Sequence, residues 1–294
     1  MKKMFTAVLT ALALTLTGCS GAGTAVTSTT EEVTLAADTP VTPLTVTFLK
    51  VGKADAAIIQ TAEHTVVIDC GEKSDGKKVV ARLQEYGVET VDYLILSHYD
   101  QDHIGGAPKV IENFNIGHVV GARQEEESKR YSQLTEALNA KEMTLELPAS
   151  PTSFTLDDAV FTLYPHKSND YSDGYDNNCT LAVKVTHHGE TLLFTGDAMQ
   201  ERLAEMMDIG DCDLMKVPYH GREIANLSAF LDVTKPEYAV ISTDEENISQ
   251  TTVTALQAVG AETYITYQTG NIIAVSDGSS IQMTTEGIKT EETT

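Results

Sequence analysis

The segment "LILSHYDQDHIGG" (94–106) constrains this chain more than any other stretch, because an apolar strand pattern runs directly into potential metal ligands. The stretch "VDYLILS" is apolar on both faces, which predicts a strand buried inside a sheet. Four metal-binding side chains follow within six residues: His98, Asp100, Asp102 and His103. A loop that curls at a strand end can direct such donors onto one or two ions, and Gly105-Gly106 lets its backbone pass close to another group.

A plainer interpretation treats the loop as solvated, with Asp102 capping a helix that begins near Ile104. Helix caps have no use for two histidines, so we favour a metal site. The aspartate at position 100 has a chemical consequence, because a carboxylate is a harder ligand than imidazole and carries a full negative charge. Asp100 therefore favours Mn²⁺ or Fe²⁺ in competition with Zn²⁺.

Two later strand patterns end in the same way. "ETLLFTGDA" places Asp197 after an apolar strand, and "DLMKVPYHG" places His220 after another. Taken alone, Asp197 would be read as the cap of the next helix and His220 as a hydrogen-bonded surface residue. Three donor-bearing strand ends together predict one shared metal centre. The pair His187-His188 lies between two strand patterns, and we interpret it as a hairpin turn with solvent-facing histidines.

Strand and helix patterns alternate from about Leu44 to about Thr285, which predicts one folded domain over 44–285, of α/β or α+β class with two layers of sheet. Of the 294 residues, 41% are hydrophobic, enough for a sizeable core. Residues 286–294 read as a disordered tail. Cys70, Cys179 and Cys212 show no CxxC spacing and permit at most one disulfide, with at least one thiol left free.

The N-terminal region has the features of a targeting segment. Two lysines precede an eleven-residue apolar run, which is too short to span a bilayer and predicts a signal peptide over 1–18. The run ends in "LTGC", which resembles a bacterial lipobox and implies lipidation of Cys19, followed by a flexible linker over 19–43. We therefore expect an extracytoplasmic lipoprotein that is anchored to the membrane through its N-terminal lipid only, with plain secretion as the alternative.

The charge of the chain limits its partners. The net charge is −23, and removal of 1–18, which holds two lysines and no acid, would leave −25. No basic cluster is present, which argues against strong binding of duplex nucleic acid and fits a small or short phosphoester better. The sequence does not define an oligomeric state or a protein partner.

The run "SHYDQDHIGG" resembles the H-x-H-x-D-H signature of the metallo-β-lactamase superfamily, with Asp100 in place of the second histidine. It looks like the competence-protein ComEC branch of that superfamily. "VTFLKVGKADAAII", "LLFTGDAMQERLAEM" and "DLMKVPYHGRE" are similar to further motifs of the branch, and "DNNCTLAV" to its "NNxS" motif. The resemblance covers about 44–285.

The resemblance implies an α+β fold, a four-layered αββα sandwich, and a metallohydrolase that uses one or two divalent ions, Zn²⁺ or Mn²⁺. It implies that the metal ligands are His98, Asp100, Asp102, His103, Asp197 and His220. Asp102 and Asp197 would also take part in catalysis. The residues expected to contact substrate or to support the ligands are Asp55, Asp69, Asn178, Lys216 and Arg222.

The chain departs from the family pattern at several positions. Tyr219 replaces the first histidine of the family's pair, and Arg222 stands where serine is usual. The usual third histidine is not evident; His166 could supply it, although a turn histidine is the plainer interpretation. The departures predict that one metal position is weak or empty.

These observations lead us to expect a surface-anchored hydrolase that cleaves a phosphodiester with a metal-activated water. Two alternatives stay open. One is hydrolysis of another ester class, such as a thioester, lactone, lactam or choline-phosphate ester. The other is a non-catalytic metal-binding lipoprotein.

Overall fold

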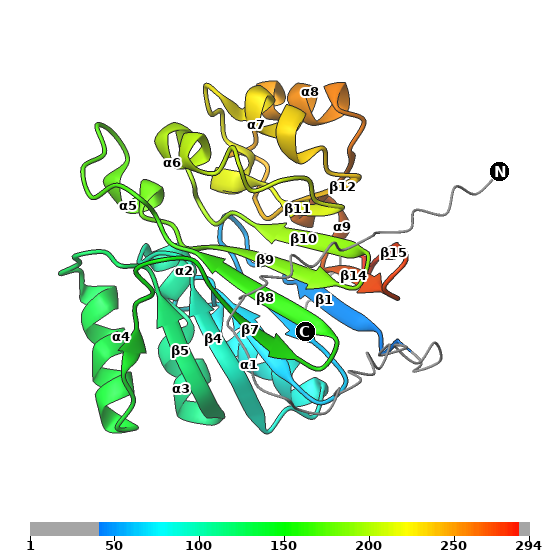
Figure 1. The fold of residues 1–294 in the computed structure, drawn as a ribbon. Helices are drawn as coiled ribbons and strands as arrows, with labels where there is room; N and C mark the ends of the chain where they lie inside the picture. The colour runs from blue at the N-terminus through cyan, green and yellow to red at the C-terminus, as the bar shows by residue number, and fades with distance from the viewer. Residues whose placement is uncertain (1–40, 288–294) are drawn as a thin grey trace, which may run out of the picture. The chain divides into compact units, whose positions relative to one another are not determined.

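The computed structural model describes residues 41–287, which form two β-sheets packed face to face (Figure 1). In spatial order, the strands of the first sheet are β15 (Ile281–Thr285), β14 (Ile272–Ser276), β1 (Leu44–Phe48), β2 (Ala57–Gln60), β3 (Thr65–Ile68), β4 (Thr90–Leu96), β5 (Asn115–Gly121) and β6 (Leu145–Glu146). Those of the second sheet are β13 (Glu262–Ile265), β12 (Tyr238–Ile241), β11 (Leu214–Lys216), β10 (Glu190–Phe194), β9 (Ala182–His187), β8 (Ala159–Tyr164) and β7 (Thr152–Leu156).

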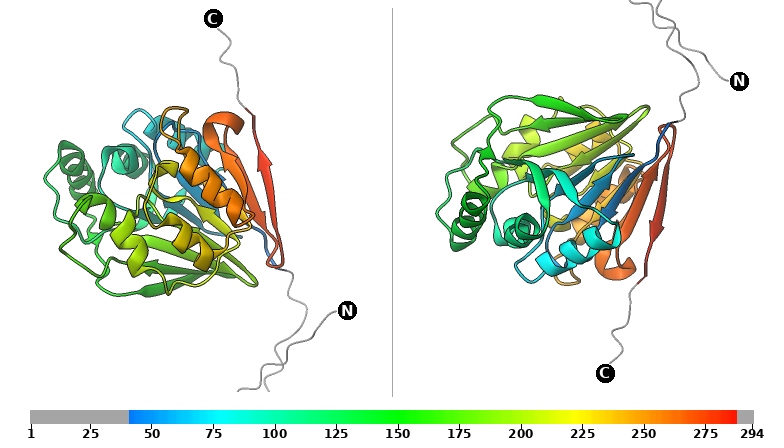
Figure 2. Two further views of the ribbon diagram at one scale, coloured as in Figure 1. Left: turned by 90° about the horizontal axis from the view of Figure 1, so that it is seen from above. Right: turned by 90° about the horizontal axis from the view of Figure 1, so that it is seen from below.

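Helices cover the outer face of each sheet (Figures 1 and 2). The first sheet packs against α1 (Gly76–Glu85), α3 (Ala107–Asn113) and α4 (Lys129–Ala140). The second packs against α6 (Gln200–Glu205), α7 (Leu227–Thr234) and α8 (Gln250–Ala258). Four short helical turns complete the set: α2 (Gln101–Ile104), α5 (Tyr175–Asn178), η1 (Pro218–Gly221) and α9 (Thr266–Thr269). The predicted four-layered αββα sandwich is confirmed.

Strand β4 shows how the sequence determines this layering. Leu94 and Leu96 pack with the helices on the outer face, whereas Ile95 belongs to the core between the sheets. All three side chains are fully buried, which explains why the strand is apolar on both faces.

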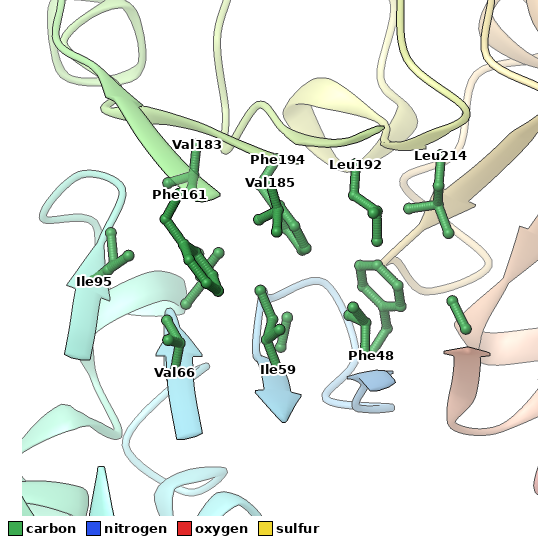
Figure 3. Close-up of a cluster of buried hydrophobic side chains, with 14 of the residues drawn as sticks. Phe48, Ile59, Val66, Ile95, Phe161, Val183, Val185, Leu192, Phe194 and Leu214 are labelled. Atoms are coloured by element: carbon green, nitrogen blue, oxygen red, sulfur yellow. The ribbon is translucent and has the colours of Figure 1, made fainter. Parts of the chain in front are cut away.

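The core between the sheets is apolar (Figure 3). Phe48, Ile59 and Val66 of the first sheet point toward Phe161 and Phe194 of the second. Burial of each such side chain contributes about 1.5–3 kcal/mol, so this core holds the two sheets, and therefore their edges, in fixed register.

The three cysteines of the described region are unpaired and buried, so none of them uses the disulfide that the sequence permits. The predicted signal peptide, Cys19 and nearly all of the predicted linker lie outside the described residues, as does most of the predicted tail. Over residues 41–287, no helix is both long and apolar enough to cross a membrane.

Candidate metal centre

Strand directions bring the donor residues of both sheets to one edge. In the first sheet β3 and β4 are parallel, so Asp69 and His98 follow adjacent strand ends. In the second sheet β10 and β11 are parallel, so Asp197 and His220 do the same. Strand β2 runs antiparallel to β3, so Asp55, two residues before β2, lies at the same edge. Sequence positions far apart therefore meet because the carboxyl ends of parallel strands share an edge.

Four buried side chains form the centre of this edge: Asp102, His103, Asp197 and His220. One donor atom from each lies within 4.8 Å of the other three. The Nε2 atom of His220 is 3.1 Å from Asp197 Oδ2 and 3.4 Å from Asp102 Oδ2, and His103 Nε2 is 3.3 Å from Asp197 Oδ1. Two imidazoles and two carboxylates at these separations form a suitable donor set for a divalent cation.

The second nitrogen of each histidine is held by the protein. His220 Nδ1 lies 3.0 Å from the carbonyl oxygen of Ser242, which can only accept, so Nδ1 carries the hydrogen. His103 Nδ1 lies 2.8 Å from Asp69 Oδ2. Asp69 is itself fixed, because it accepts 2.8 Å and 2.6 Å bonds from the backbone N–H and hydroxyl of Ser97. Both imidazoles therefore present Nε2 to the centre, as metal-binding histidines do.

The residues present fit a metal ion, because most of the atoms facing the centre have no hydrogen-bond partner. His103 Nε2, His220 Nε2 and Asp197 Oδ1 are all buried and without a bond of good geometry. Asp102 Oδ2 is buried as well, and its closest contact is the ammonium of Lys53 at 2.6 Å. Buried polar atoms normally have partners, and unpaired donor atoms that converge on one point suit a cation.

The opposite charges of the four side chains also shift one another's pKa values. Burial lowers the pKa of the His220 imidazole, but the carboxylates of Asp197 and Asp55 raise it to about 10. Burial raises the pKa of Asp197, but the imidazoles of His220 and His103 lower it well below its ordinary value. Without a metal, protons on the histidines supply the positive charge that the carboxylates require.

The backbone adopts an unfavourable conformation at the donor His220 and at Asp69, which holds His103. His220 has φ +52° and ψ +26°, and Asp69 has φ +58°, in the left-handed region that non-glycine residues seldom occupy. Such strain is typical of functional sites, where the surrounding structure enforces it. Close packing fixes the loop of His103 as well: a methyl group on Gly106 would lie 2.1 Å from the carbonyl oxygen of Cys70. The close backbone passage predicted for Gly105-Gly106 is therefore present.

The other two predicted ligands form a pair beside the centre. His98 is fully buried and its Nε2 atom also lacks a hydrogen-bond partner. That atom is 3.5 Å from Asp100 Oδ2, and the ring centroids of His98 and His103 are 4.0 Å apart. The side chain of Asp100 is 41% exposed. It occupies the N-cap position of α2 without a capping bond, and Asp102 lies inside that helix, so neither aspartate acts as the cap that the plainer interpretation required.

Of the residues predicted to contact substrate or to support the ligands, some lie next to the donor residues and others do not. Asp55 and Lys216 form a buried ion pair next to His220 and Asp197, and Lys216 Nζ also donates to the carbonyl of Gly196 at 3.1 Å. Burial raises the pKa of Asp55, but Lys216 lowers it to about 2.

Asn178 does not reach the centre. Its side chain accepts from the backbone N–H of Arg202 and donates to the carbonyl of Asp173. Arg222 is half-buried, bonds to Asn247 and stacks over the ring of Tyr219.

Sequence reasoning missed Lys53. Its ammonium lies 2.6 Å from Asp102 Oδ2, and its side chain is 30% exposed. Burial lowers the pKa of Lys53, but the hydrogen bond and charge of Asp102 raise it above its ordinary value. The sequence feature that could have pointed to Lys53 is its position two residues before Asp55 in "VGKADA", the loop that leads to the site.

Two other histidines named in the sequence analysis, His166 and His187, have hydrogen bonds to both ring nitrogens. His166 Nδ1 and Nε2 bond to the carbonyls of Ser168 and Arg123, so His166 does not supply the missing third ligand. The His187-His188 hairpin is present, but His187 is buried, which corrects the prediction that both histidines face solvent. Both nitrogens of His187 are bonded, to the hydroxyl of Ser276 and to the carbonyl of Thr42.

The fold and this site agree with the comparisons to known proteins. Residues 49–244 match the metallo-beta-lactamase superfamily, and the match covers more than half of the chain. The chain therefore belongs to the metallo-β-lactamase superfamily and has a candidate metal site. The resemblance inferred from the sequence is confirmed.

Similar curated proteins include competence proteins. The chain is 25% identical to ComE operon protein 3 of Bacillus subtilis over 176 residues, which cover 58% of this chain and 22% of that protein. It is 25% identical to competence protein ComA of Neisseria gonorrhoeae over 219 residues, 72% of this chain and 29% of that protein. The chain thus spans less than a third of these relatives. A hydroxyacylglutathione hydrolase of Aliivibrio salmonicida is 39% identical over 62 residues, 21% of this chain and 23% of that protein.

Solved structures agree in fold. The metallo-beta-lactamase fold protein YhfI of Bacillus subtilis superposes with a TM-score of 0.55 at 14% identity, over 80% of this chain and 100% of that one. A putative metal-dependent hydrolase from Parabacteroides distasonis gives a TM-score of 0.52 at 14% identity, over 76% and 93%. At these identities the likeness establishes the fold alone.

Proposed function

We propose that this protein hydrolyses a small or short phosphodiester at the cell surface, with Zn²⁺ or Mn²⁺ held by Asp102, His103, Asp197 and His220. A divalent ion in this place supplies a Lewis acid for attack on the ester. Two carboxylates in the donor set favour Mn²⁺ more than an all-histidine site does.

The observation that carries the proposal is the partly exposed ammonium of Lys53, 2.6 Å from the metal ligand Asp102. Arg222 lies near enough for its charge to act on that of Lys53. In a chain with net charge −23, a cation at the metal centre and a second one within electrostatic range of it favour a substrate that is negatively charged where it reacts. Lys53 would bind a phosphoryl oxygen, while Asp69 and Ser242 hold the two imidazoles in place.

The test compares hydrolysis of bis-p-nitrophenyl phosphate with that of a glutathione thioester, each with added Mn²⁺ or Zn²⁺. The thioester is the alternative that the short match to a hydroxyacylglutathione hydrolase favours. We expect turnover of the phosphodiester. Turnover of the thioester alone would reassign the substrate class, and turnover of neither with metal bound would support a binding protein.

Lys53→Gln sharpens the test, because loss of one charged contact should raise KM for the phosphodiester about tenfold. Lys73→Gln, which removes a lysine from an exposed position, is the matched control and should leave KM unchanged. An unchanged KM in Lys53→Gln would remove Lys53 from substrate binding.

Surface anchoring has its own test. Cys19→Ala should move the protein from the membrane fraction to the soluble extracytoplasmic fraction, whereas an unaltered distribution would contradict the lipid anchor.

A further inference from the structure

A cavity with a volume of about 450 Å³, which is in the range of small-molecule sites, lies away from the metal-binding residues. It lies between the loop after β5, the loop before β7, the loop after β8 and helix α6. The charged residues of its lining are Arg123, Lys167, Arg202, Glu205 and Asp208. Their formal charges sum to +1, which is unusual on a chain of net charge −23.

Two of the charged residues already have all the partners they need. Glu205 accepts bonds from the backbone N–H groups of Lys167 and Ser168, from the hydroxyl of Tyr171 and from Arg202. Arg202 is fully buried and donates to two backbone carbonyls as well as to Glu205. These side chains therefore form a rigid wall and have no capacity left for a ligand.

Arg123 differs from them because its guanidinium has no acidic partner. Across the described residues its side chain makes one hydrogen bond, a 3.3 Å bond to the carbonyl of His166, and its Nε atom is buried without an acceptor. A guanidinium has five N–H donors in a planar fork, so most of the donors of Arg123 are unused. A planar or tetrahedral oxyanion is the group that satisfies such a fork.

The structure holds Arg123 in this position. His166 Nε2 lies 2.9 Å from the carbonyl of Arg123, and Nδ1 of the same ring lies 2.5 Å from the carbonyl of Ser168. The buried His166 thus connects the loop after β5 to the loop after β8, and both loops line the cavity. The unpaired cation belongs to a built site and not to a free surface side chain.

From the unpaired Arg123 and the cavity that it lines, we propose that the protein has a second binding site, for a small oxyanion such as a phosphate or a carboxylate group. The site is separate from the metal centre, because none of the residues that line the cavity belongs to the donor set. This inference does not depend on the substrate proposed above.

Isothermal titration calorimetry with inorganic phosphate and with acetate tests the proposal on the full chain, both as purified and after chelation of metals. We expect saturable binding of at least one anion in both samples. Arg123→Gln should weaken it about tenfold or more. Arg123→Lys, which keeps the charge but loses the fork, should fall between the two.

Two controls distinguish this site from other sources of binding. Arg130→Gln removes a different half-buried arginine, bonded to Gln133, and should leave anion affinity unchanged. After chelation, Lys53→Gln should also leave it unchanged, so equal loss in chelated Lys53→Gln and Arg123→Gln would place the anion at the metal centre and overturn the proposal. Undiminished binding by a folded Arg123→Gln protein, or no binding of either anion by the wild type, would overturn it as well.

Discussion

At the scale of single residues, the metal centre is defined by where hydrogen bonds are absent. His103 and His220 each have one nitrogen bonded to the protein and one that faces the centre without a partner. Asp197 turns an unbonded oxygen to the same point, and Asp102 turns to it the oxygen that Lys53 contacts from the outside. The arrangement is costly without a cation and favourable with one, so the ion should be part of the folded structure.

Asp102→Asn tests this directly, because it keeps the shape of the side chain and removes one negative ligand. We expect metal affinity to fall by at least the roughly 10- to 100-fold that loss of an outer partner of a metal site costs, with activity falling in parallel. Metal content of the purified protein and calorimetric titration with Mn²⁺ and Zn²⁺ measure the effect.

The matched control is Asp92→Asn, which removes a carboxylate that pairs with His64 outside the donor set. It should bind metal as the wild type does. Wild-type metal content in Asp102→Asn would exclude Asp102 as a ligand.

The four residues that meet at the centre were among the six ligands predicted from the sequence, whereas the role of the residues around them could not be predicted. The loop after β4, with Asp197 and His220, stood out because each donor follows an apolar strand. The orienting role of Asp69 depends on the left-handed backbone after β3, and the position of Lys53 depends on how the loop before β2 folds back. No pattern of several residues in the sequence predicts either of these two backbone conformations.

At the scale of elements, strands with apolar residues on both faces were predictable and polar elements were not. Strands β4, β10 and β11 lie close to the predicted positions. Strand β7, "TSFTL", is at the edge of its sheet and mostly exposed, so it lacks the apolar pattern that identifies a strand. Strand β5 is buried only in its second half, for the same reason.

Helix α6 gives a prediction at this scale, because Glu205 near its end anchors the loop after β8. Burial raises the pKa of Glu205, but bonds from the N–H groups of Lys167 and Ser168 lower it below the ordinary value of 4.5. A carboxyl whose pKa is lowered by folding stabilises the protein above its unfolded pKa, and the contribution is lost as the pH falls through the folded value.

Glu205→Gln should therefore lower the free energy of unfolding by about 1–3 kcal/mol at pH 7. The difference from wild type should shrink as the pH falls below about 4.5. Urea unfolding at pH 7 and at a pH below about 4.5 measures both effects. Glu201→Gln, on the same helix and bonded to the exposed Ser172, should cost less. A constant difference across pH would show that the charge of Glu205 is not the source of the stability.

At the scale of the whole molecule, the two sheets position one edge and the net charge determines what approaches it. The core between the sheets fixes β3, β4, β10 and β11 relative to one another, so donors from both sheets stay in contact. The chain as a whole carries a net charge of −23, while the metal centre presents Lys53 to the exterior. An anionic substrate must therefore cross a repulsive field before it meets an attractive one.

Ionic strength separates these two fields. Raising it from about 0.01 M to about 0.15 M shortens the Debye length from about 30 Å to about 8 Å, which screens the distant acidic surface more than the contact with Lys53. We expect kcat/KM for bis-p-nitrophenyl phosphate to rise at least about twofold over this range, because long-range repulsion limits encounter. A neutral ester that the same preparation hydrolyses serves as the control and should show no such rise. A fall in kcat/KM with salt would mean that attraction by Lys53 and Arg222 outweighs the repulsion of the rest of the surface. It would contradict the expectation that repulsion limits encounter.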